Sequence, residues 1–579
     1  MAAEFIKRET RGGTTIKLHR GERKCLIGLD LDRANATEDF VGFALEFREP
    51  NSETWKRVSN RLRFSYDGLT EEEKKKGAPS TEAPIQKFRW IHFPFEPQDG
   101  VYRYRATPMY MRPDESLMRG QAVEASIDLS HQTIEGVLDV GFTRGYASSQ
   151  AYANRTRFPC QERILPALGS AAPADLAHDM SQCQVEYDWL GFESRATIYA
   201  LLEEAIIDPS VTVDGLFYEL REPEIVRKLA RLGSRLRAII DNHDAHGDQD
   251  SNESTASDLL SNAGAQVKRG KFARQQHNKV LILRRDGTAY KALAGSTNFS
   301  LRGLYVQSNN TIVFSDQKTT ALLGSVFESY FSLIDRPRAA SRFRQDPLSQ
   351  AWHDCSSPGG PVIRIAVSPH TDPSLTLDPI AEAIEQAESS VLYAVVFLNQ
   401  LTGRVRDTLE ELVHRSTFSY GISQRRGSLS VFKPDGSRGL VTFAYLAGET
   451  PEPFSTEWSS YSGGESKSNV LHHKFVVTDF NTPQAKVFTG SSNMAKGGEE
   501  DNGDHLILIE DRRVATAYAV EALRIFDHFH FRVAMREADA EREVIKLAKL
   551  PAPGEHPWFR EAYVPGHVKE RDRLLFSSE

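Results

Sequence analysis

Hydrophobic positions in the middle of the chain follow two alternating periods from about residue 193 onward. Residues 196–206 carry apolar side chains at helical spacing, and residues 211–218 alternate as a strand does. A helix is predicted over 223–233, with Pro near its start and Gly at its end, and a buried strand over 236–241. Strands that alternate with helices indicate an α/β sheet.

The same order of elements returns in the second half of the chain. A helix is predicted to open at Asp378-Pro379, because Asp is favoured at a helix cap and Pro in the first turn. Residues 336–361 are rich in Arg, Pro, Ser and Gly, which is typical of a linker. The repeat predicts two α/β lobes, the first within residues 131–345 and the second, with a C-terminal tail, within residues 346–579.

The first 130 residues show a different pattern. Short runs of alternating apolar and polar residues are typical of strands, and Asp99-Gly100 is a turn signal. The clearest runs are 24–31, 41–47 and 101–107. They predict an all-β, sandwich-like domain over residues 1–130. No catalytic group of residues occurs there, so we expect a docking or supporting role.

Composition limits the class of protein. A chain of 579 residues is long enough for three folding units, and 40% hydrophobic and 26% charged residues are ordinary for a globular protein. The net charge of -8 argues against a general polyanion-binding protein. No run approaches the roughly 18 apolar residues of a membrane span, and the N-terminus lacks the apolar core of a secretory signal. We therefore expect a cytoplasmic protein without a transmembrane segment.

Two further features are interpreted as structural. The four cysteines lie far apart without a CxxC pair, so we expect reduced, buried thiols rather than a disulfide framework or a zinc site. Residues 241–264 are rich in His and Asp and poor in apolar residues. Polar surface loops collect such residues freely, so we predict a mobile loop there and no metal site.

One short pattern occurs twice in the chain. The first copy is His277-Asn278-Lys279 with Gly295-Ser296-Thr297-Asn298, and the second is His472-His473-Lys474 with Gly490-Ser491-Ser492-Asn493. In both copies the histidine precedes the glycine by 18 residues, and the copies lie 195 residues apart. Either copy alone is compatible with a histidine that is simply buried in a core. The matched spacing indicates one shared site.

Each HxK is predicted to begin a strand, and each GSxN to end the following one. Positions i and i+2 of a strand share a face, so His277 and Lys279 point the same way, as do His472 and Lys474. Lysines neutralise phosphate oxygens, hydroxyls and amides stabilise developing charge, and histidines supply a nucleophile and an acid near neutral pH. The two copies together predict phosphodiester chemistry that needs no metal ion and no other cofactor.

These motifs resemble the signature of the phospholipase D superfamily, HxKxxxxD followed by GSxN, which usually occurs twice. The resemblance covers about residues 190–535 and implies two pseudo-symmetric phospholipase D-like α-β-α lobes. The second copy is complete, with Asp479 at the acidic position. In the first copy Arg284 stands in that place and Asp286 follows two residues later.

The resemblance also implies a role for each matching residue. His277 would be the nucleophile that forms a covalent phosphohistidine. His472 would be the general acid and then the base that activates water or an alcohol. The residues expected to hold the phosphate are Lys279, Lys474, Asn298 and Asn493, those expected to bind substrate are Ser296 and Ser491, and those expected to support or orient the site are Asp479, Asn310 and Asp504.

The motif does not separate phospholipases from nucleases. Two motifs in one chain favour a phospholipase-type hydrolase or transphosphatidylase, whose membrane contact would be peripheral. The basic run from Lys268 to Arg274 favours a nuclease, because Phe272 could stack on a base, but a basic rim would equally attract anionic lipid headgroups. A non-catalytic scaffold is the third alternative, because Arg284 replaces the motif carboxylate.

Overall fold

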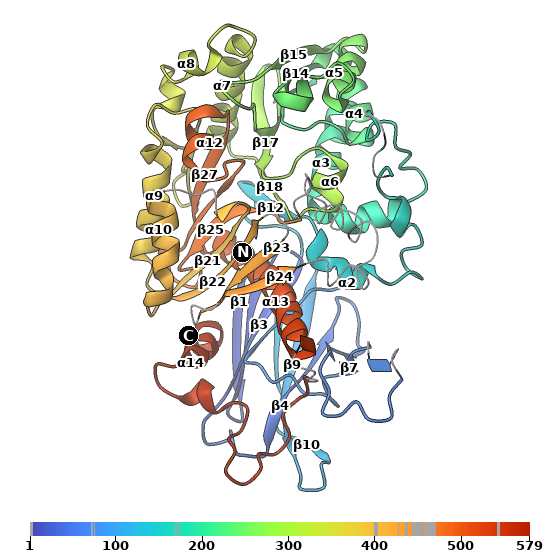
Figure 1. Cartoon of the computed structure of the whole chain (residues 1–579), viewed down its shortest axis with the longest axis vertical. Helices are drawn as coiled ribbons and strands as arrows, with labels where there is room; N and C mark the ends of the chain where they lie inside the picture. The colour runs from blue at the N-terminus through green and yellow to red at the C-terminus, as the bar shows by residue number, and fades with distance from the viewer. Residues whose placement is uncertain are drawn as a thin grey trace. The chain divides into compact units, whose positions relative to one another are not determined.

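The computed structural model describes residues 4–70, 73–74, 76–167, 170, 173–398, 403–425, 428–434, 438–442, 454, 470–540 and 545–579. The chain forms two compact units. One comprises Thr133–Ala515, and the other comprises Met1–Gln132 together with Thr516–Glu579. Figure 1 traces the chain through both units from blue to red. Both copies of the repeated motif lie in the unit Thr133–Ala515.

The first lobe of this unit is a seven-stranded sheet in the order β12-β18-β17-β16-β13-β14-β15. Neighbouring strands β13 and β14 run parallel, whereas β16 and β17 form an antiparallel hairpin. The strands are β12 (Leu138–Phe142), β13 (Val211–Phe217), β14 (Leu236–Asp241), β15 (Gln266–Gly270), β16 (Lys279–Arg285), β17 (Thr288–Gly295) and β18 (Asn310–Phe314). The strands expected near residues 211 and 236 are therefore present.

Helices pack on this sheet through their apolar residues. Helix α7 contacts β13, β16 and β17, and α3 contacts β12, β13 and β18. Glu222 caps α4, because its carboxylate accepts the N–H of Ile225 at 2.6 Å. The helices of the first lobe are α3 (Gln184–Ile207), α4 (Pro223–Ala230), α5 (Asn252–Asn262), α6 (Leu301–Tyr305), α7 (Gln317–Leu333) and α8 (Ala339–Phe343).

The second lobe repeats the central arrangement in a nine-stranded sheet, β19-β20-β27-β26-β25-β21-β22-β23-β24. Its strands are β19 (His353–Asp354), β20 (Val362–Val367), β21 (Ser390–Val395), β22 (Phe418–Arg425), β23 (Ser428–Phe432), β24 (Arg438–Thr442), β25 (Lys474–Thr478), β26 (Lys486–Gly490) and β27 (His505–Glu510). Helices α9 (Ser374–Gln386) and α10 (Arg404–Glu411) pack together, and α9 contacts β25. The run β27-β26-β25-β21-β22 matches β18-β17-β16-β13-β14 strand for strand, including the parallel pair β21 and β22.

The other unit is built on two antiparallel sheets, in the orders β1-β2-β3-β8 and β10-β9-β4-β5, with β11 paired to β9. The three runs with clear strand patterns are β3, β4 and β9. The strands of the two sheets are β1 (Ile6–Arg11), β2 (Thr14–Gly21), β3 (Lys24–Leu31), β4 (Phe40–Arg48), β5 (Lys56–Arg57), β8 (Arg89–His92), β9 (Val101–Met111), β10 (Leu117–Arg119) and β11 (Val123–Asp128). The fold class is confirmed: two α/β lobes follow an N-terminal, sandwich-like β domain.

The C-terminal segment differs from its predicted place. It was assigned to the second lobe, but Thr516–Glu579 belongs to the unit of the β domain. Phe559 and Ala562 lie in the same hydrophobic cluster as Phe40 and Tyr102, and Trp558 packs against it. Helix α14 (Val568–Ser577) contacts β3. A short apolar run of this kind carries no period that would reveal which domain it covers.

Three local predictions need correction. The predicted loop 241–264 contains the helix α5, which Ser251 caps by accepting the N–H of Ser254. The predicted linker contains α8 and the strand β19. Helix α9 begins at Ser374, one turn before the expected start, so Pro379 lies inside it. In each case tertiary packing orders a segment whose local composition favours irregular structure.

The cysteine prediction is also wrong in part. Cys160 and Cys183 form a disulfide, with their Cα atoms 5.6 Å apart, whereas Cys25 and Cys355 are free and buried. The two bonded residues are 23 apart in sequence, and only the fold of the segment between them brings them together. Disulfides are typical of oxidising compartments, so the cytoplasmic location stays a prediction with an observation against it. Within the described residues, no helix is long and apolar enough to cross a bilayer.

Candidate active site

The repeated motif occupies equivalent strand ends in the two lobes. Lys279 is the first residue of β16 and Lys474 the first residue of β25, so each motif histidine stands just before its strand. The glycine of each GSxN ends the partner strand. Gly295 and Gly490 both have a φ of 142°, and a Cβ at either position would collide with a backbone oxygen of the neighbouring strand. Glycine is therefore required at both turns.

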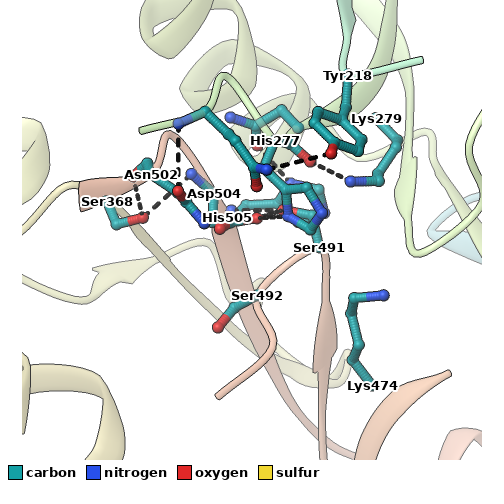
Figure 2. A network of polar contacts seen from close by, with 12 residues as sticks. Tyr218, His277, Lys279, Ser368, Lys474, Ser491, Ser492, Asn502, Asp504 and His505 are labelled. Atoms are coloured by element: carbon teal, nitrogen blue, oxygen red, sulfur yellow. Dashed lines mark hydrogen bonds and ion pairs between the residues drawn. The ribbon is translucent and has the colours of Figure 1, made fainter. Parts of the chain in front are cut away.

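The two motif histidines are held by side chains of the opposite lobe. His277 Nδ1–H donates to Oδ1 of Asp504 at 2.7 Å. His472 Nδ1 lies 2.9 Å from Oδ1 of Asn309 and 3.1 Å from the carbonyl oxygen of Ser296. Since these acceptors all need a proton on Nδ1, each imidazole carries Nδ1–H, and in the neutral ring Nε2 keeps its lone pair. Figure 2 shows His277 beside Asp504, with Lys279 and Tyr218 close by.

The motif serines donate hydrogen bonds to Asp504 and Asn309, the residues that contact the histidines, and not to the motif histidines themselves. Ser491 Oγ donates to Oδ1 of Asp504 at 2.6 Å, and Ser296 Oγ donates to Oδ1 of Asn309 at 2.9 Å. Both serines are fully buried. Their predicted contact with substrate stays a prediction, and the contact that the structure does show is with the groups that orient the histidines.

The residue that orients His472 lies one position before the predicted one. Asn309, not Asn310, contacts the ring of His472, while the amide of Asn310 lies 3.4 Å from Nδ1 of His473. The sequence contains a signal for Asn309, because it follows the motif serine Ser296 by 13 residues, just as Asp504 follows Ser491 by 13. Asp504 stands where it was predicted.

Two buried lysines supply the positive charge of the site. Lys474 Nζ donates to the carbonyl oxygen of His472 at 2.9 Å and lies 3.1 Å from Nε2 of the same ring. Lys279 Nζ donates to the carbonyl oxygen of His277 and lies 4.8 Å from the centre of the Tyr218 ring. Burial lowers the pKa of Lys279 to about 7. Burial and the charge of Lys279 lower the pKa of Lys474 well below its ordinary value.

The charges around the two histidines differ. Burial lowers the pKa of His277, and nearby Lys279 lowers it further, but the carboxylate of Asp504 opposes both effects. Burial would raise the pKa of Asp504, yet His277 and Lys279 bring it down to about 2, so this carboxylate stays ionised. Burial and the two lysines lower the pKa of His472 well below its ordinary value, and the carbonyl oxygen of Ser296 opposes them only in part. An anion between the lysines would raise the pKa of His472.

The motif asparagines complete the two edges. Asn298 and Asn493 follow the two glycines at the same offset, and each leaves its Oδ1 atom buried without a hydrogen-bond partner among the described residues. An unpaired Oδ1 is an acceptor that calls for a hydrogen-bond donor, and a phosphate oxygen is not one, so these atoms do not themselves indicate a phosphate. Amide groups suit a phosphate oxygen through their N–H donors.

Comparisons with known proteins agree with this geometry. Residues 205–331 match the family model described as the cardiolipin synthase, PLD-like domain. This part of the chain is thus similar to a phospholipase D-like domain. The matched range includes His277, Lys279 and Asn298. No curated protein sequence matches the chain.

Several solved structures are similar to the chain at low identity. Phosphatidylserine synthase from Haemophilus influenzae Rd KW20 is 14% identical, covers 57% of this chain and 84% of its own, and has a TM-score of 0.39. Nuc from Salmonella typhimurium is 21% identical over 23% of this chain and 86% of its own, with a TM-score of 0.20. Yeast tyrosyl-DNA phosphodiesterase is 11% identical over 54% and 86%, with a TM-score of 0.31. Likenesses this weak carry no argument about substrate.

The acidic position of the phospholipase D-like motif lies away from the histidines. In the second lobe Asp479 follows the far end of β25 and accepts the N–H groups of Glu388, Ser389 and Ser390 at 2.7–3.1 Å. It thus fixes the start of β21. In the first lobe the side chain of Arg284 joins Asp214 at 2.6 Å instead. The carboxylate of Asp479 is therefore structural, and Arg284 in the first lobe contacts Asp214 and Glu328 rather than His277.

Sequence reasoning missed three residues that position the site. The ring of Tyr218 packs edge-on against His277, with 4.6 Å between ring centres. Asp241, at the end of β14, accepts the N–H of the residue before His277 at 2.7 Å. Gln424, on the equivalent strand β22, accepts the N–H groups of Val470 and Leu471 at 2.9 Å, just before His472. Asp241 and Gln424 occupy matching strand ends, which the repeat could have indicated.

The basic run before His277 is less exposed than predicted. Phe272 is buried against Tyr330 and Phe343, so it cannot stack on a base, and that interpretation is wrong. Lys268 pairs with Asp335 at 2.9 Å, and Arg269 donates to the backbone of Asp241. The exposed basic residues left in this run are Lys271 and Arg274.

Potential metal ligands do not gather near these histidines. Within the described part of Thr133–Ala515, no three His, Cys, Asp or Glu side chains approach closely enough to hold a metal ion. The His and Asp residues of 241–264 make protein contacts instead; for example, His246 Nδ1 lies 2.9 Å from Oδ2 of Asp241.

Proposed function

We propose that the chain is a metal-independent phosphodiesterase of phospholipase D type that transfers a phosphatidyl group from phospholipid to water or an alcohol. The observation that carries this proposal is the crossed pair of contacts, His277 with Asp504 and His472 with Asn309, beside two buried lysines. One imidazole is backed by a carboxylate and the other by a neutral amide. That difference suits two histidines with different tasks.

His277 is the nucleophile in this mechanism. Its Nε2 lone pair attacks phosphorus while the bond from phosphorus to the leaving oxygen breaks, which leaves a phosphohistidine. The imidazole ring becomes positively charged as the N–P bond forms, and the carboxylate of Asp504 at Nδ1 stabilises that charge. Lys279 and Lys474 neutralise the non-bridging oxygens, as the asparagine amides donate to them.

His472 is the acid and then the base. With Nδ1–H held by Asn309, its Nε2 protonates the leaving oxygen, then takes a proton from water or an alcohol. That oxygen attacks phosphorus, the N–P bond breaks, and His277 is free again. The acid form requires that bound phosphate raise the depressed pKa of His472, so protonation follows substrate binding.

Phospholipid is preferred to nucleic acid as the substrate on structural grounds. The nuclease interpretation depended on a basic run with an aromatic platform, and Phe272 is buried. The scaffold interpretation depended on Arg284, which lies in an ion pair with Asp214 and Glu328 rather than at the histidines. The cytoplasmic location, the peripheral membrane contact and the oligomeric state are separate predictions.

The decisive experiment compares phosphatidylcholine and plasmid DNA in EDTA. Headgroup release by wild type, lost in His277→Ala and in His472→Ala but kept in His556→Ala, supports the proposal; His556 is an exposed histidine of the other unit. With ethanol present, phosphatidylethanol should form, since the phosphohistidine accepts an alcohol. DNA nicking without lipid cleavage would replace phospholipid by nucleic acid as the substrate. Activity that survives both histidine substitutions would falsify the mechanism.

A further inference from the structure

Consecutive residues of the two lobes pair across the site in two short ladders. On one side the N–H of His277 donates to the carbonyl oxygen of Gly503 at 2.8 Å, and the N–H of Gly503 donates to that of Gln275 at 2.8 Å. On the other side the N–H of His472 donates to the carbonyl oxygen of Ser308 at 3.1 Å. Each of these segments thus forms an isolated parallel bridge with the opposite lobe.

Side chains extend each ladder by two more rungs. After the bridge comes the contact that orients a motif histidine, His277 with Asp504 or His472 with Asn309. One residue further along both segments comes a second contact that the mechanism does not use. It joins Asn278 to His505 on one side and His473 to Asn310 on the other. The middle residue of each HxK therefore contacts the residue after the orienting group.

The ring of His505 is held at both nitrogens. Its Nδ1–H donates to Oδ1 of Asn278 at 2.7 Å, and its Nε2 accepts the N–H of Gly295 at 3.2 Å. It therefore joins the first HxK to the first GSxN, although it belongs to the second lobe. The ring is 1% exposed, and Figure 2 shows it beside His277 and Asp504.

We propose that Asn278 and His505 are positioning residues that fix the register of the two lobes and thereby hold Asp504 opposite His277. The pair His473 and Asn310 does the same for Asn309 and His472. The inference rests on the proposed function only for its effect on rate. Its physical basis is that a slip of one residue would leave the imidazole of His505 and the amide of Asn278 buried without partners, which is costly.

Both of these second contacts join an asparagine to a histidine, but the two residue types exchange their positions in the motif. The first lobe contributes Asn278 and Asn310, and the second contributes His505 and His473. Asn278 and His473 occupy the same motif position, as do Asn310 and His505. An Asn–His rung therefore works in either orientation in this molecule. This symmetry provides a test in which a defect made by one substitution is repaired by a second.

The experiment measures steady-state cleavage of a phosphodiester by His505→Asn, Asn278→His and the double variant. Each single variant should lower kcat by about 10- to 100-fold with little change in KM, because the nucleophile moves while the lysines and asparagines still bind phosphate. The double variant restores an Asn–His rung and should be at least about tenfold faster than either single variant. His414→Asn, at an exposed histidine of the same unit, is the control and should match wild type.

A second measurement does not depend on catalysis. In NMR spectra of protein labelled with ¹⁵N-histidine, the signal of His505 is identified as the one that is missing from His505→Asn. This signal should show a neutral ring protonated at Nδ1 from pH 5 to pH 8, because burial lowers the pKa of His505 to about 3. A His505 signal that titrates near the ordinary pKa of histidine would contradict the proposed role of Asn278 and His505. A double variant no faster than the single variants would contradict it as well. If wild type cleaves no phosphodiester while the neutral Nδ1–H signal is present, the proposed function fails and the pair stands.

Discussion

The two lobes share a motif but surround its histidine with different chemistry. His277 faces the carboxylate of Asp504, and the segment before it is held by the carboxylate of Asp241. His472 faces the amide of Asn309, and the segment before it is held by the amide of Gln424. The backbone arrangement is the same on both sides. In the proposed mechanism this difference in charge separates His277, the nucleophile, from His472, the acid and base.

The largest expected effect comes from removing that charge difference. Asp504→Asn should lower kcat by about 100-fold or more, because a neutral amide cannot stabilise the cationic phosphohistidine and its NH₂ group can turn toward Nδ1. Single-turnover rates with a chromogenic phosphodiester measure this step directly. Asp501→Asn, at a half-exposed carboxylate that ends the helix α12 (Lys496–Asp501), is the matched control. An equal loss of kcat in the two variants would show that Asp504 does not stabilise the phosphohistidine.

The reverse substitution should sharpen the comparison. Asn309→Asp places a carboxylate beside His472 and should raise the pKa of its imidazole, which shifts the pH profile of kcat to higher pH. The change in maximal rate should be smaller than in Asp504→Asn, about tenfold at most, because His472 keeps its Nδ1 acceptor. Profiles measured from pH 5 to pH 9 test the shift. An unmoved profile would mean that His472 does not transfer the proton.

The lysines predict a second pH dependence. Lys279 must be protonated to neutralise phosphate, and its pKa is lowered to about 7, so kcat/KM of wild type should fall as pH rises above about 7. Lys279→Met removes this group, so the alkaline limb near that pH should disappear while kcat/KM falls throughout, and it also removes the charge that lowers the pKa of Lys474. Lys549→Met, at an exposed lysine of the other unit, should leave the limb in place.

The smallest effects concern the motif's acidic position. Asp479→Ala leaves three backbone N–H groups without their acceptor and should lower the free energy of unfolding by about 2–4 kcal/mol. Asp286→Asn, at the exposed turn of the first lobe where φ is 51°, should change it by less than about 0.5 kcal/mol, because Asn tolerates this conformation. Urea unfolding measures both. Neither substitution should alter kcat of the folded protein, because neither carboxylate contacts the motif histidines; a loss of kcat in Asp479→Ala would contradict this.

Most of the local structure was accessible from the chain itself. The strands β14 and β16 and the helix α4 follow from periods in the hydrophobic positions, because a half-buried strand or helix must present one apolar face. The matched spacing of HxK and GSxN predicted the residues of the site. Sequence patterns failed for α5, for the Cys160–Cys183 disulfide and for the segment around Phe559, because the fold and not a local period sets the packing partners of each one.

What the sequence determined by itself is the repeat: two histidines, two lysines and two asparagines on matched strand ends. What only the tertiary structure decided is which partner each histidine meets. Asp504 lies 227 residues from His277 and Asn309 lies 163 residues from His472, so no local pattern links them. The pairing arises where the two lobes meet, and there a carboxylate on one side and an amide on the other make chemically unequal sites from one repeated motif.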